Sequence, residues 1–482
     1  MIYYGRNHWY TILINYYKLL KKLWAVLIVI TIPSIAYGFD YIIFTFILLA
    51  SFCFLKWLNE YIFINEEYLI YKKGIFMTER VKIPLNSISL VEFKRNIVYV
   101  IMGIQKLKIE SISPKDRRFD IVMIIKKDKI REFQKVVTIN TNLYMGYKVQ
   151  DNISAEFGYK IYGRHLLILA TLRSNIILGI GIIYSLAHFI SLIDQQFKDD
   201  IKDLIFKLIN NSFLLTKDIG AFIIYFLLSI IILVVVIIIF SIIGIIFKYY
   251  KFRLYRIENY INIKHGLLVR KEYSININKV HAIKIEQNLI NQILGLYTLK
   301  AAVVGFGNSP KEDEIIFPLC DKEICDYIIK DIIPEFKFTE KVHIPPKRAF
   351  NNFYMSWIGW SAVIAVIVYF MTKGSLIGGI LIPLTILWRF LVKKNSGLAV
   401  SDDVLYFSSR SFVRRIFLIR ASSMIECTKV VNPFQRRKDI CDYKIKFYSQ
   451  KKMDWIKVKN MESYLYKEIK AGMNKRIKIR RK

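Results

Sequence analysis

The chain has 482 residues, which is enough for about three domains of ordinary size. Hydrophobic residues make up 54% of it and charged residues 23%, and its formal net charge is +34. This combination argues against a compact soluble enzyme and against a protein made wholly of membrane helices. We therefore expect apolar and charged residues to be segregated along the chain.

Two apolar runs follow one another near the N-terminus. They cover residues 23–39 and 41–58, and little more than Asp40 separates them. A helix needs roughly 20 apolar residues to cross a bilayer, so we predict a first transmembrane hairpin within residues 1–58. A secretory signal peptide over residues 18–38 is the alternative. The second run favours the hairpin, because it would itself anchor the chain.

Four more apolar runs occur in two pairs further along the chain. They cover residues 174–193, 219–247, 356–372 and 375–392. We predict a second transmembrane pair within residues 165–247, with an extracytoplasmic loop at residues 194–218, and a third hairpin within residues 347–392. The sequence therefore predicts a polytopic α-helical membrane protein with six transmembrane helices in three hairpins.

Basic residues gather at one side of these runs. They are Arg6, Lys18, Lys21 and Lys22 before the first run, Lys248, Lys251, Arg253 and Arg256 after the fourth, and Lys393 and Lys394 after the sixth. The hairpin tips are close to neutral by comparison. Because cytoplasmic loops carry an excess of Lys and Arg, we expect both termini and nearly all of the net charge to lie on the cytoplasmic side of a cell membrane.

A segment of about 17 residues occurs three times at matching places after the apolar pairs. It reads "EFKRNIVYVIMGIQKLK", "KIEQNLINQILGLYTLK" and, in a degenerate form, "TKVVNPFQRRKDICDYK", at residues 92–108, 284–300 and 428–444. The residues that we expect to define the repeated fold are Gly74, Pro84, Asn96, Gly103, Gly266, Asn288, Gly295 and Asn432. The Asn residues suit turns and the Gly residues suit special backbone angles.

The repeat predicts three copies of one domain. They occupy residues 59–150, 248–335 and 394–473, and a basic tail follows at residues 474–482. Within each copy, short segments such as "YLIYKKG" and "YINIKHG" alternate with a period of two, which predicts antiparallel strands. Apolar residues at helical spacing near the end, such as Ile130, Phe133 and Val137, predict a closing helix. Each copy is therefore expected to be a small β-barrel capped by a C-terminal helix.

The stretch "IPLNSISLVEFKRNIVYVIMGIQKLKIES" resembles the signature of the bacterial pleckstrin-homology (PH) domain membrane proteins. The whole chain is similar to the multi-domain YdbT-like group of that family. The resemblance implies three cytoplasmic PH-like domains interleaved with paired membrane helices. The third copy departs from the pattern, because Asp439 replaces the turn Gly and no Pro matches Pro84. The family is named for a fold and implies no settled activity.

Catalytic and metal-binding patterns are weak. The six His are scattered, and among the five Cys only Cys320 and Cys325 lie near one another, at a spacing that is poor for zinc. The segment "GFGNSPK" at residues 305–311 lacks the full phosphate-binding loop pattern. We therefore predict a non-enzymatic protein with no cofactor and no metal.

Basic residues beside aromatic ones, together with the tail, are candidate contacts for anionic lipid. They are Lys248, Lys251, Arg253, Arg256, Arg436, Arg437, Lys438, Lys475, Arg476, Lys478, Arg480, Arg481 and Lys482. For the residues nearest the apolar runs, the bias toward positive cytoplasmic loops is an equally good explanation.

These observations predict an integral membrane scaffold whose PH-like domains bind anionic lipid headgroups or partner proteins at the inner face. Its partners are the membrane and its anionic phospholipids, with an unidentified protein or a second copy of the chain as alternatives, and no nucleic acid is expected. A transporter or lipid-handling membrane protein is the rival class. It would need a polar pathway, for which Arg173 and His188 are weak signals.

Overall fold

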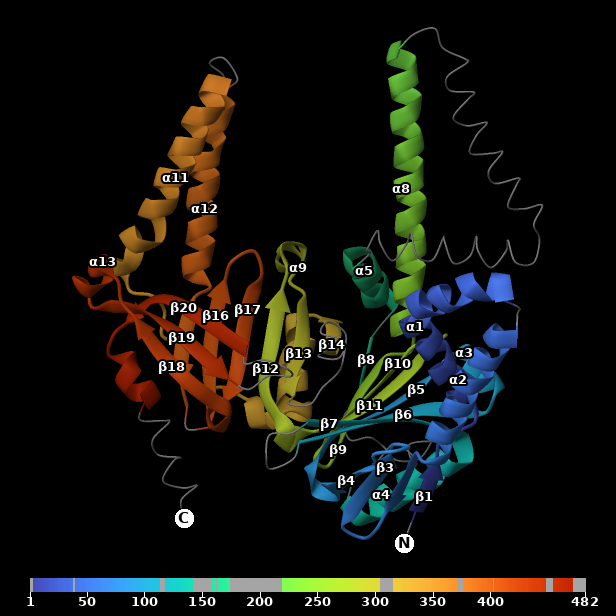
Figure 1. Ribbon diagram of the computed structural model, residues 1–482. Helices are drawn as coiled ribbons and strands as arrows, with labels where there is room; N and C mark the ends of the chain where they lie inside the picture. The colour runs from blue at the N-terminus through green and yellow to red at the C-terminus, as the bar shows by residue number, and fades with distance from the viewer. Residues whose placement is uncertain are drawn as a thin grey trace. The chain divides into compact units, whose positions relative to one another are not determined.

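The computed structural model describes residues 3–37, 40–112, 118–141, 158–161, 163–173, 219–303, 315–371, 376–401, 403–447 and 454–470 (Figure 1). The described residues form two compact units. The first unit lies within residues 1–159, 254–263 and 271–482, and the second lies within residues 160–253 and 264–270.

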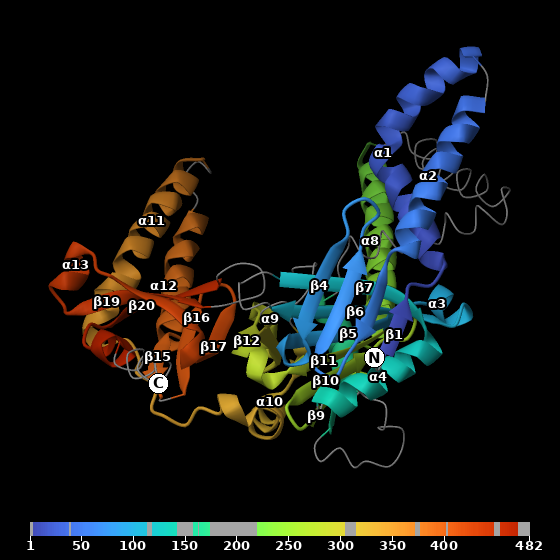
Figure 2. The same ribbon diagram turned by 60° about the horizontal axis from the view of Figure 1, so that its bottom comes forward.

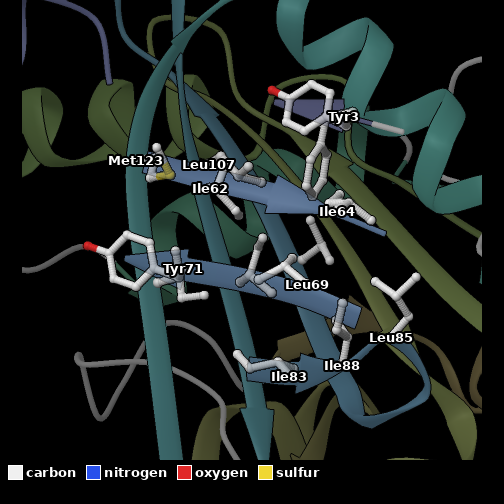
Figure 3. Packing of buried hydrophobic residues seen from close by; sticks show 14 of the residues in the cluster. Tyr3, Ile62, Ile64, Leu69, Tyr71, Ile83, Leu85, Ile88, Leu107 and Met123 are labelled. Carbon is white, nitrogen blue, oxygen red and sulfur yellow. The ribbon is translucent and has the colours of Figure 1, made fainter. Parts of the chain in front are cut away.

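The first domain is built from two antiparallel sheets and a helix. The first sheet contains β1 (Tyr3–Arg6), β2 (Tyr61–Ile64), β3 (Tyr68–Lys73) and β4 (Glu79–Pro84), in that order. The chain continues through β5 (Ile88–Arg95), β6 (Ile104–Ile112), β7 (Arg118–Lys126) and helix α4 (Lys127–Thr141). Because side chains alternate along a strand, every second residue of β2 and β3 enters the core. Ile62, Leu69 and Leu107 pack there between the sheets (Figure 3).

The second and third domains repeat this plan. The second contains β8 (Gly158–Lys160), β9 (Arg253–Ile257), β10 (Tyr260–His265), β11 (Arg270–Asn276), β12 (Val280–Gln287), β13 (Tyr297–Val303), β14 (Ile315–Cys320) and α10 (Lys322–Tyr327). The third contains β15 (Gly397–Val400), β16 (Val404–Arg410), β17 (Arg414–Arg420), β18 (Met424–Val430), β19 (Ile440–Phe447) and β20 (Asp454–Glu462). Three β-rich domains of the PH type therefore fit the structure.

Neighbouring domains share their sheets. The strand orders are β7-β6-β5-β11-β10-β9-β8 and β14-β13-β12-β17-β16-β15, so each of these sheets takes strands from two consecutive repeats. In the second one, β12 pairs antiparallel with β17, from Ala282 opposite Ile419 to Gln287 opposite Arg414 (Figure 1). The repeats are therefore joined edge to edge and are not three independent barrels.

Apolar helices accompany the domains. In the first unit, α1 (Tyr10–Tyr37) packs against α2 (Asp40–Leu58), and α11 (Phe350–Met371) packs against α12 (Leu381–Lys394) (Figure 2). Both pairs run antiparallel, as expected for two helices joined by a short link. Helix α1 begins directly after β1, and α2 ends directly before β2. The first helix pair is therefore inserted between two neighbouring strands of one sheet.

The prediction of six transmembrane helices is wrong. Among the described residues, one helical stretch, Lys347–Met371, is long and apolar enough to cross a membrane. The apolar stretches Ile43–Leu58 and Val234–Tyr249 are shorter. Helix α12 has 14 residues, and it contains Arg389, whose Nε donates a hydrogen bond of 2.7 Å to the Phe353 carbonyl. For the sixth predicted span, hydropathy did not show that α12 begins only at Leu381. Residues 174–193 lie outside the described part.

In the second unit, the end of a helix is hydrogen-bonded to the turn between two strands. It contains α5 (Gly163–Arg173), α8 (Ile219–Tyr249) and the turn between β10 and β11. The amides of Gly266 and Leu267 donate to the carbonyls of Tyr250 and Phe247, each at 2.9 Å. The His265 ring stacks on Tyr249, with centroids 5.6 Å apart. This turn therefore fixes the C-terminal end of α8.

Candidate functional site

A cavity of about 490 Å³ lies in the first domain, beside the start of α1 and the end of α2. Its lining residues are Asn7, Thr11, Ile14, Asn15 and Lys18 from the start of the chain, Lys56 and Glu60 from the end of α2, Tyr71, Lys73, Gly74, Met77 and Glu79 around the β3–β4 turn, and Tyr99, Lys106, Val122 and Ile124 from the second sheet side. The helix pair thus forms one wall and the strands form the others.

Hydrogen bonds fix the helix wall to the sheet. The Asn7 side chain accepts from the Ile124 amide at 2.8 Å, and the His8 amide donates to the Ile124 carbonyl at 2.6 Å. The Trp57 indole donates to the Asn7 carbonyl at 2.7 Å. Because buried backbone groups are paired in this way, the cavity has a defined shape.

The cavity has an excess of positive charge. Lys73 forms an ion pair of 3.0 Å with Glu79, and Glu60 accepts a hydrogen bond from the buried Tyr71 hydroxyl. Three lysines, Lys18, Lys56 and Lys106, complete the charged lining, and none of them forms an ion pair with another described residue.

The surroundings of Lys106 disfavour its charged form. Burial lowers its pKa from the ordinary 10.5, and the nearby positive charges of Lys94, Lys18 and Lys108 lower it further, while Glu92 acts in the opposite direction. A lowered pKa means that the charged form is poorly compensated in this position. An anion in the cavity would supply the missing compensation.

A buried hydroxyl also faces this cavity without a partner. Thr11 lines the cavity and is only 8% exposed, and its Oγ1 has no hydrogen-bond partner among the described residues. An unsatisfied buried polar group costs about 1–3 kcal/mol. The cavity therefore combines cations with an available hydrogen-bonding group, which suits a ligand that carries negatively charged oxygens.

The predicted lipid contacts lie elsewhere in the chain. Lys251 and Arg253 are exposed just after α8, and Lys248 is half-buried in its last turn. Arg256 is held by Glu335, with contacts of 2.6 and 3.0 Å, so this cation already has a structural partner. Lys475, Arg476, Lys478, Arg480, Arg481 and Lys482 lie outside the described residues.

In the third domain, the predicted contacts surround the short helix α13 (Pro433–Arg436). Arg436 and Arg437 are exposed, and Lys438 donates to the Asn352 side chain at 3.3 Å.

Sequence reasoning missed the cavity lysines Lys56 and Lys106. The sequence carried no distinct signal for Lys106, because β6 reads "IQKLKIESI" and Lys108 and Glu110 occupy equivalent alternating positions.

The residues expected to define the fold lie at turns and helix starts. Gly74 and Gly266 have φ angles of +117° and +106°, and Gly103 and Gly295 have φ angles of +64° and +68°. In the third copy, Asn432 forms a capping box with Gln435 at the start of α13. The other residues of this set are Asn96 and Asn288, which precede α3 (Ile97–Ile101) and α9 (Leu289–Ile293) without a side-chain cap, and Pro84 at the end of β4.

The two neighbouring cysteines are both buried. Cys320 donates to the Tyr297 carbonyl at 3.5 Å, and burial raises its pKa well above the ordinary value. No group of three His, Cys, Asp or Glu side chains is placed to hold a metal in the part of the chain that the structure describes. The burial of both thiols favours packing over metal binding.

The model of the bacterial PH domain family matches three segments, at residues 12–138, 214–333 and 355–473. The chain belongs to this family. It is also 24% identical over 408 residues to the UPF0699 transmembrane protein YdbT of Bacillus subtilis (strain 168), an alignment that covers 81% of this chain and 80% of that protein. No solved structure matches the chain. The three PH matches extend across the apolar helices, so the family unit includes helices as well as strands.

Proposed function

We propose that this bacterial PH protein is a non-enzymatic scaffold at the inner face of the cell membrane, and that its PH domains bind anionic lipid headgroups. The cavity of the first domain carries this proposal. It brings Lys18, Lys56 and Lys106 together with the unpartnered Thr11 hydroxyl. A phosphate group provides the negative oxygens that these groups lack.

The chemistry of the cavity favours phosphate over an uncharged ligand. Lysine ammonium groups donate charge-assisted hydrogen bonds, which are roughly twice as strong as neutral ones. Lys106 would gain most, because a bound anion offsets both its burial and the charges of Lys94 and Lys18. The concave site beside the apolar helices α1 and α2 suits a lipid headgroup better than a flat protein surface.

Membrane location is supported by two further observations. Helix α11 belongs to the stretch that is long and apolar enough to span a bilayer, and a relative of similar length is named a transmembrane protein. The basic residues after α8 and α12 favour the cytoplasmic side for the PH domains. The exposed Arg436 and Arg437 would add to the attraction toward an anionic leaflet.

Removing the cavity charges should abolish most headgroup binding. We expect Lys18→Gln with Lys106→Gln to weaken binding about tenfold or more, since a hydrogen bond to a charged group contributes about 1.5–3 kcal/mol. The measurement is a titration of the full chain, held in neutral-lipid nanodiscs, with short-chain phosphatidylglycerol. Short-chain phosphatidylcholine and inorganic phosphate are the comparison ligands.

Lys129→Gln is the matched control, because Lys129 is exposed on α4 and pairs there with Glu132 at 2.7 Å. It removes a positive charge without touching the cavity, so binding should persist. The double variant should fold at least as well as the parent, because like charges are removed. Equal affinity of the parent and the folded double variant would refute headgroup binding at this site. If inorganic phosphate bound as tightly as short-chain phosphatidylglycerol, the site would be assigned to free phosphate and not to a lipid headgroup.

Headgroup affinity should also weaken as the pH rises. Since the pKa of Lys106 lies below 10.5, this residue loses its charge at a lower pH than an ordinary lysine, and the loss removes a favourable contact with the anion. The same titration at increasing pH measures the effect. Lys106→Arg should flatten the profile, because Arg stays protonated throughout. An unchanged profile in that variant would exclude Lys106 as the titrating group.

A further inference from the structure

Each PH domain carries a short helical turn between the first two strands of its second sheet. These turns are α3 between β5 and β6, α9 between β12 and β13, and α13 between β18 and β19. Each follows an Asn and ends near a residue with positive φ, namely Gly103, Gly295 or Asp439. They are the same element in three copies (Figure 1).

The turns expose large apolar side chains. The exposed residues are Ile97, Val98, Val100 and Ile101 on α3, Leu289, Ile290, Ile293 and Leu294 on and just after α9, and Phe434 on α13. Ile101 is 80% exposed, Ile293 is 84% exposed and Phe434 is 73% exposed. Single exposed apolar residues are ordinary, but contiguous ones mark interaction sites. The recurrence of such residues at equivalent turns makes a chance origin a poor explanation.

Polar residues that face inward hold two of the turns, α9 and α13, in place. In α13, the buried Gln435 side chain donates to Asp442 at 2.7 Å and to Asn460 at 2.8 Å. In α9, Asn291 is buried, and its carbonyl accepts from the Leu296 amide at 2.8 Å. The apolar side chains of these two turns are therefore presented by a preformed backbone, which lowers the entropy cost of binding.

Two of the turns lie beside the points where apolar helices leave their domains. The Tyr99 ring of α3 contacts the Tyr10 ring in the first turn of α1, with centroids 6.1 Å apart. Just after α13, Lys438 donates to Asn352 in the first turn of α11. Helix α11 belongs to the stretch that is long and apolar enough to span a membrane. A membrane that receives α11 would therefore lie next to α13.

The differences between the turns favour a bilayer as the partner. The first two present aliphatic side chains, whereas the third presents Phe434 together with the exposed cations Arg436 and Arg437. A protein groove requires a particular shape, whereas the lipid interface accepts any apolar group and attracts neighbouring cations. One partner surface can therefore accommodate all three turns.

We propose that α3, α9 and α13 insert into the headgroup and upper acyl region of the bilayer as three shallow anchors. The inference rests on the membrane location in the proposed function, but it is independent of headgroup binding in the cavity. The anchors would hold each PH domain against the membrane surface by burial of apolar area, which needs no anionic lipid for α3 and α9.

Lipid contact can be measured with single labels on the full chain. Ile101→Cys, Ile293→Cys and Phe434→Cys would each carry an environment-sensitive fluorophore, and Lys129→Cys on α4 is the matched control. The native cysteines should react little with the fluorophore, because Cys53, Cys320, Cys325 and Cys441 are buried and burial raises the pKa of Cys427 to about 12. The parent chain, treated in the same way, measures any background labelling. The proteins are reconstituted in vesicles whose phosphatidylcholine carries brominated acyl chains.

We expect bromine to quench the labels at positions 101 and 293 severalfold more than the label at position 129, even in purely neutral vesicles. The label at position 434 should need added phosphatidylglycerol for its full quenching. Quenching at 101 and 293 that matches the control would overturn the proposal, and so would a blue shift without bromine quenching, because it would show that protein covers the turns. If bromine quenched the labels in neutral vesicles but the titrations showed no headgroup binding, the membrane anchors would be supported and headgroup binding in the cavity would be rejected.

Discussion

Acidification from pH 7 toward pH 4 should loosen the connection between the second and third domains, because His281 is held there in its neutral form. Its Nδ1 lies 2.6 Å from the Ser423 hydroxyl across the boundary. Burial lowers the pKa of His281 from 6.5 to about 4, and the positive charges of Arg420 and Lys279 contribute. This residue immediately precedes the paired part of β12.

The direction of the effect follows from which state binds the proton. The unfolded chain takes up a proton on His281 near pH 6.5, whereas the folded chain resists until about pH 4. The stabilisation is therefore complete above pH 6.5 and is lost as the pH falls toward 4. A shift of this size corresponds to about 3 kcal/mol at most.

Hydrogen exchange of β12 and β17 in the reconstituted full chain measures the loosening directly. Both strands should exchange faster at pH 5 than at pH 7.5, after correction for the intrinsic effect of pH. His281→Gln should remove most of this acid dependence, and His343→Gln, at the isolated bridge to Leu398, should retain it. Equal protection at both pH values in the parent chain would contradict the assignment.

The sequence predicts local elements well because they depend on neighbouring residues. Alternation in "YLIYKKG" and "YINIKHG" corresponds to β3 and β10, and the Gly that ends each segment lies at a turn with positive φ. Both features are set by contacts within a few residues. The threefold repeat could also be recognised, because equivalent domains keep equivalent turn residues.

Pairing between repeats could not be predicted in the same way. Ile283 and Leu418 face each other across the domain boundary, but each is only an apolar residue in an alternating strand. A lone PH domain and a sheet-sharing pair have the same local pattern. The choice depends on which strand edges meet in space.

The cavity could not be predicted from the sequence for a related reason. Lys18 and Lys106 are far apart in the sequence, and only the packing of α1 beside the sheet brings them to one site. The unpartnered Thr11 hydroxyl is a property of the assembled wall and leaves no mark in the sequence. The sixth predicted membrane span was wrong because composition shows neither the start of α12 nor the hydrogen bond of Arg389.

Glycine substitutions should separate two kinds of turn. Gly266→Asn should destabilise the protein by about 3 kcal/mol or more, since an outlying φ angle costs about 1–3 kcal/mol and an added Cβ would also overlap the Val269 carbonyl oxygen. Gly74→Asn should destabilise the protein by a similar amount, because its Cβ would overlap the Met77 carbonyl oxygen. Denaturant unfolding of the full chain measures both.

Gly103→Asn and Gly295→Asn are the matched controls. Their φ angles of +64° and +68° suit Asn, and an added Cβ would meet no atom within 4 Å. These variants should lose less than about 1 kcal/mol, whereas the β-branched Gly103→Val and Gly295→Val should lose about 1–3 kcal/mol. If Asn were tolerated equally at all four positions, the overlap with the carbonyl oxygens would not limit these turns.

The two severe variants should also differ in their functional effects. Gly266 donates its amide to Tyr250 at the end of α8, so Gly266→Asn should release that helix end, which faster exchange of residues 244–250 would show. Gly74 lines the cavity, so Gly74→Asn should weaken headgroup binding in protein that remains folded. Because Gly266 does not line that cavity, headgroup binding should persist in folded Gly266→Asn protein. Loss of headgroup binding in both variants would indicate general unfolding and not a local change at each turn.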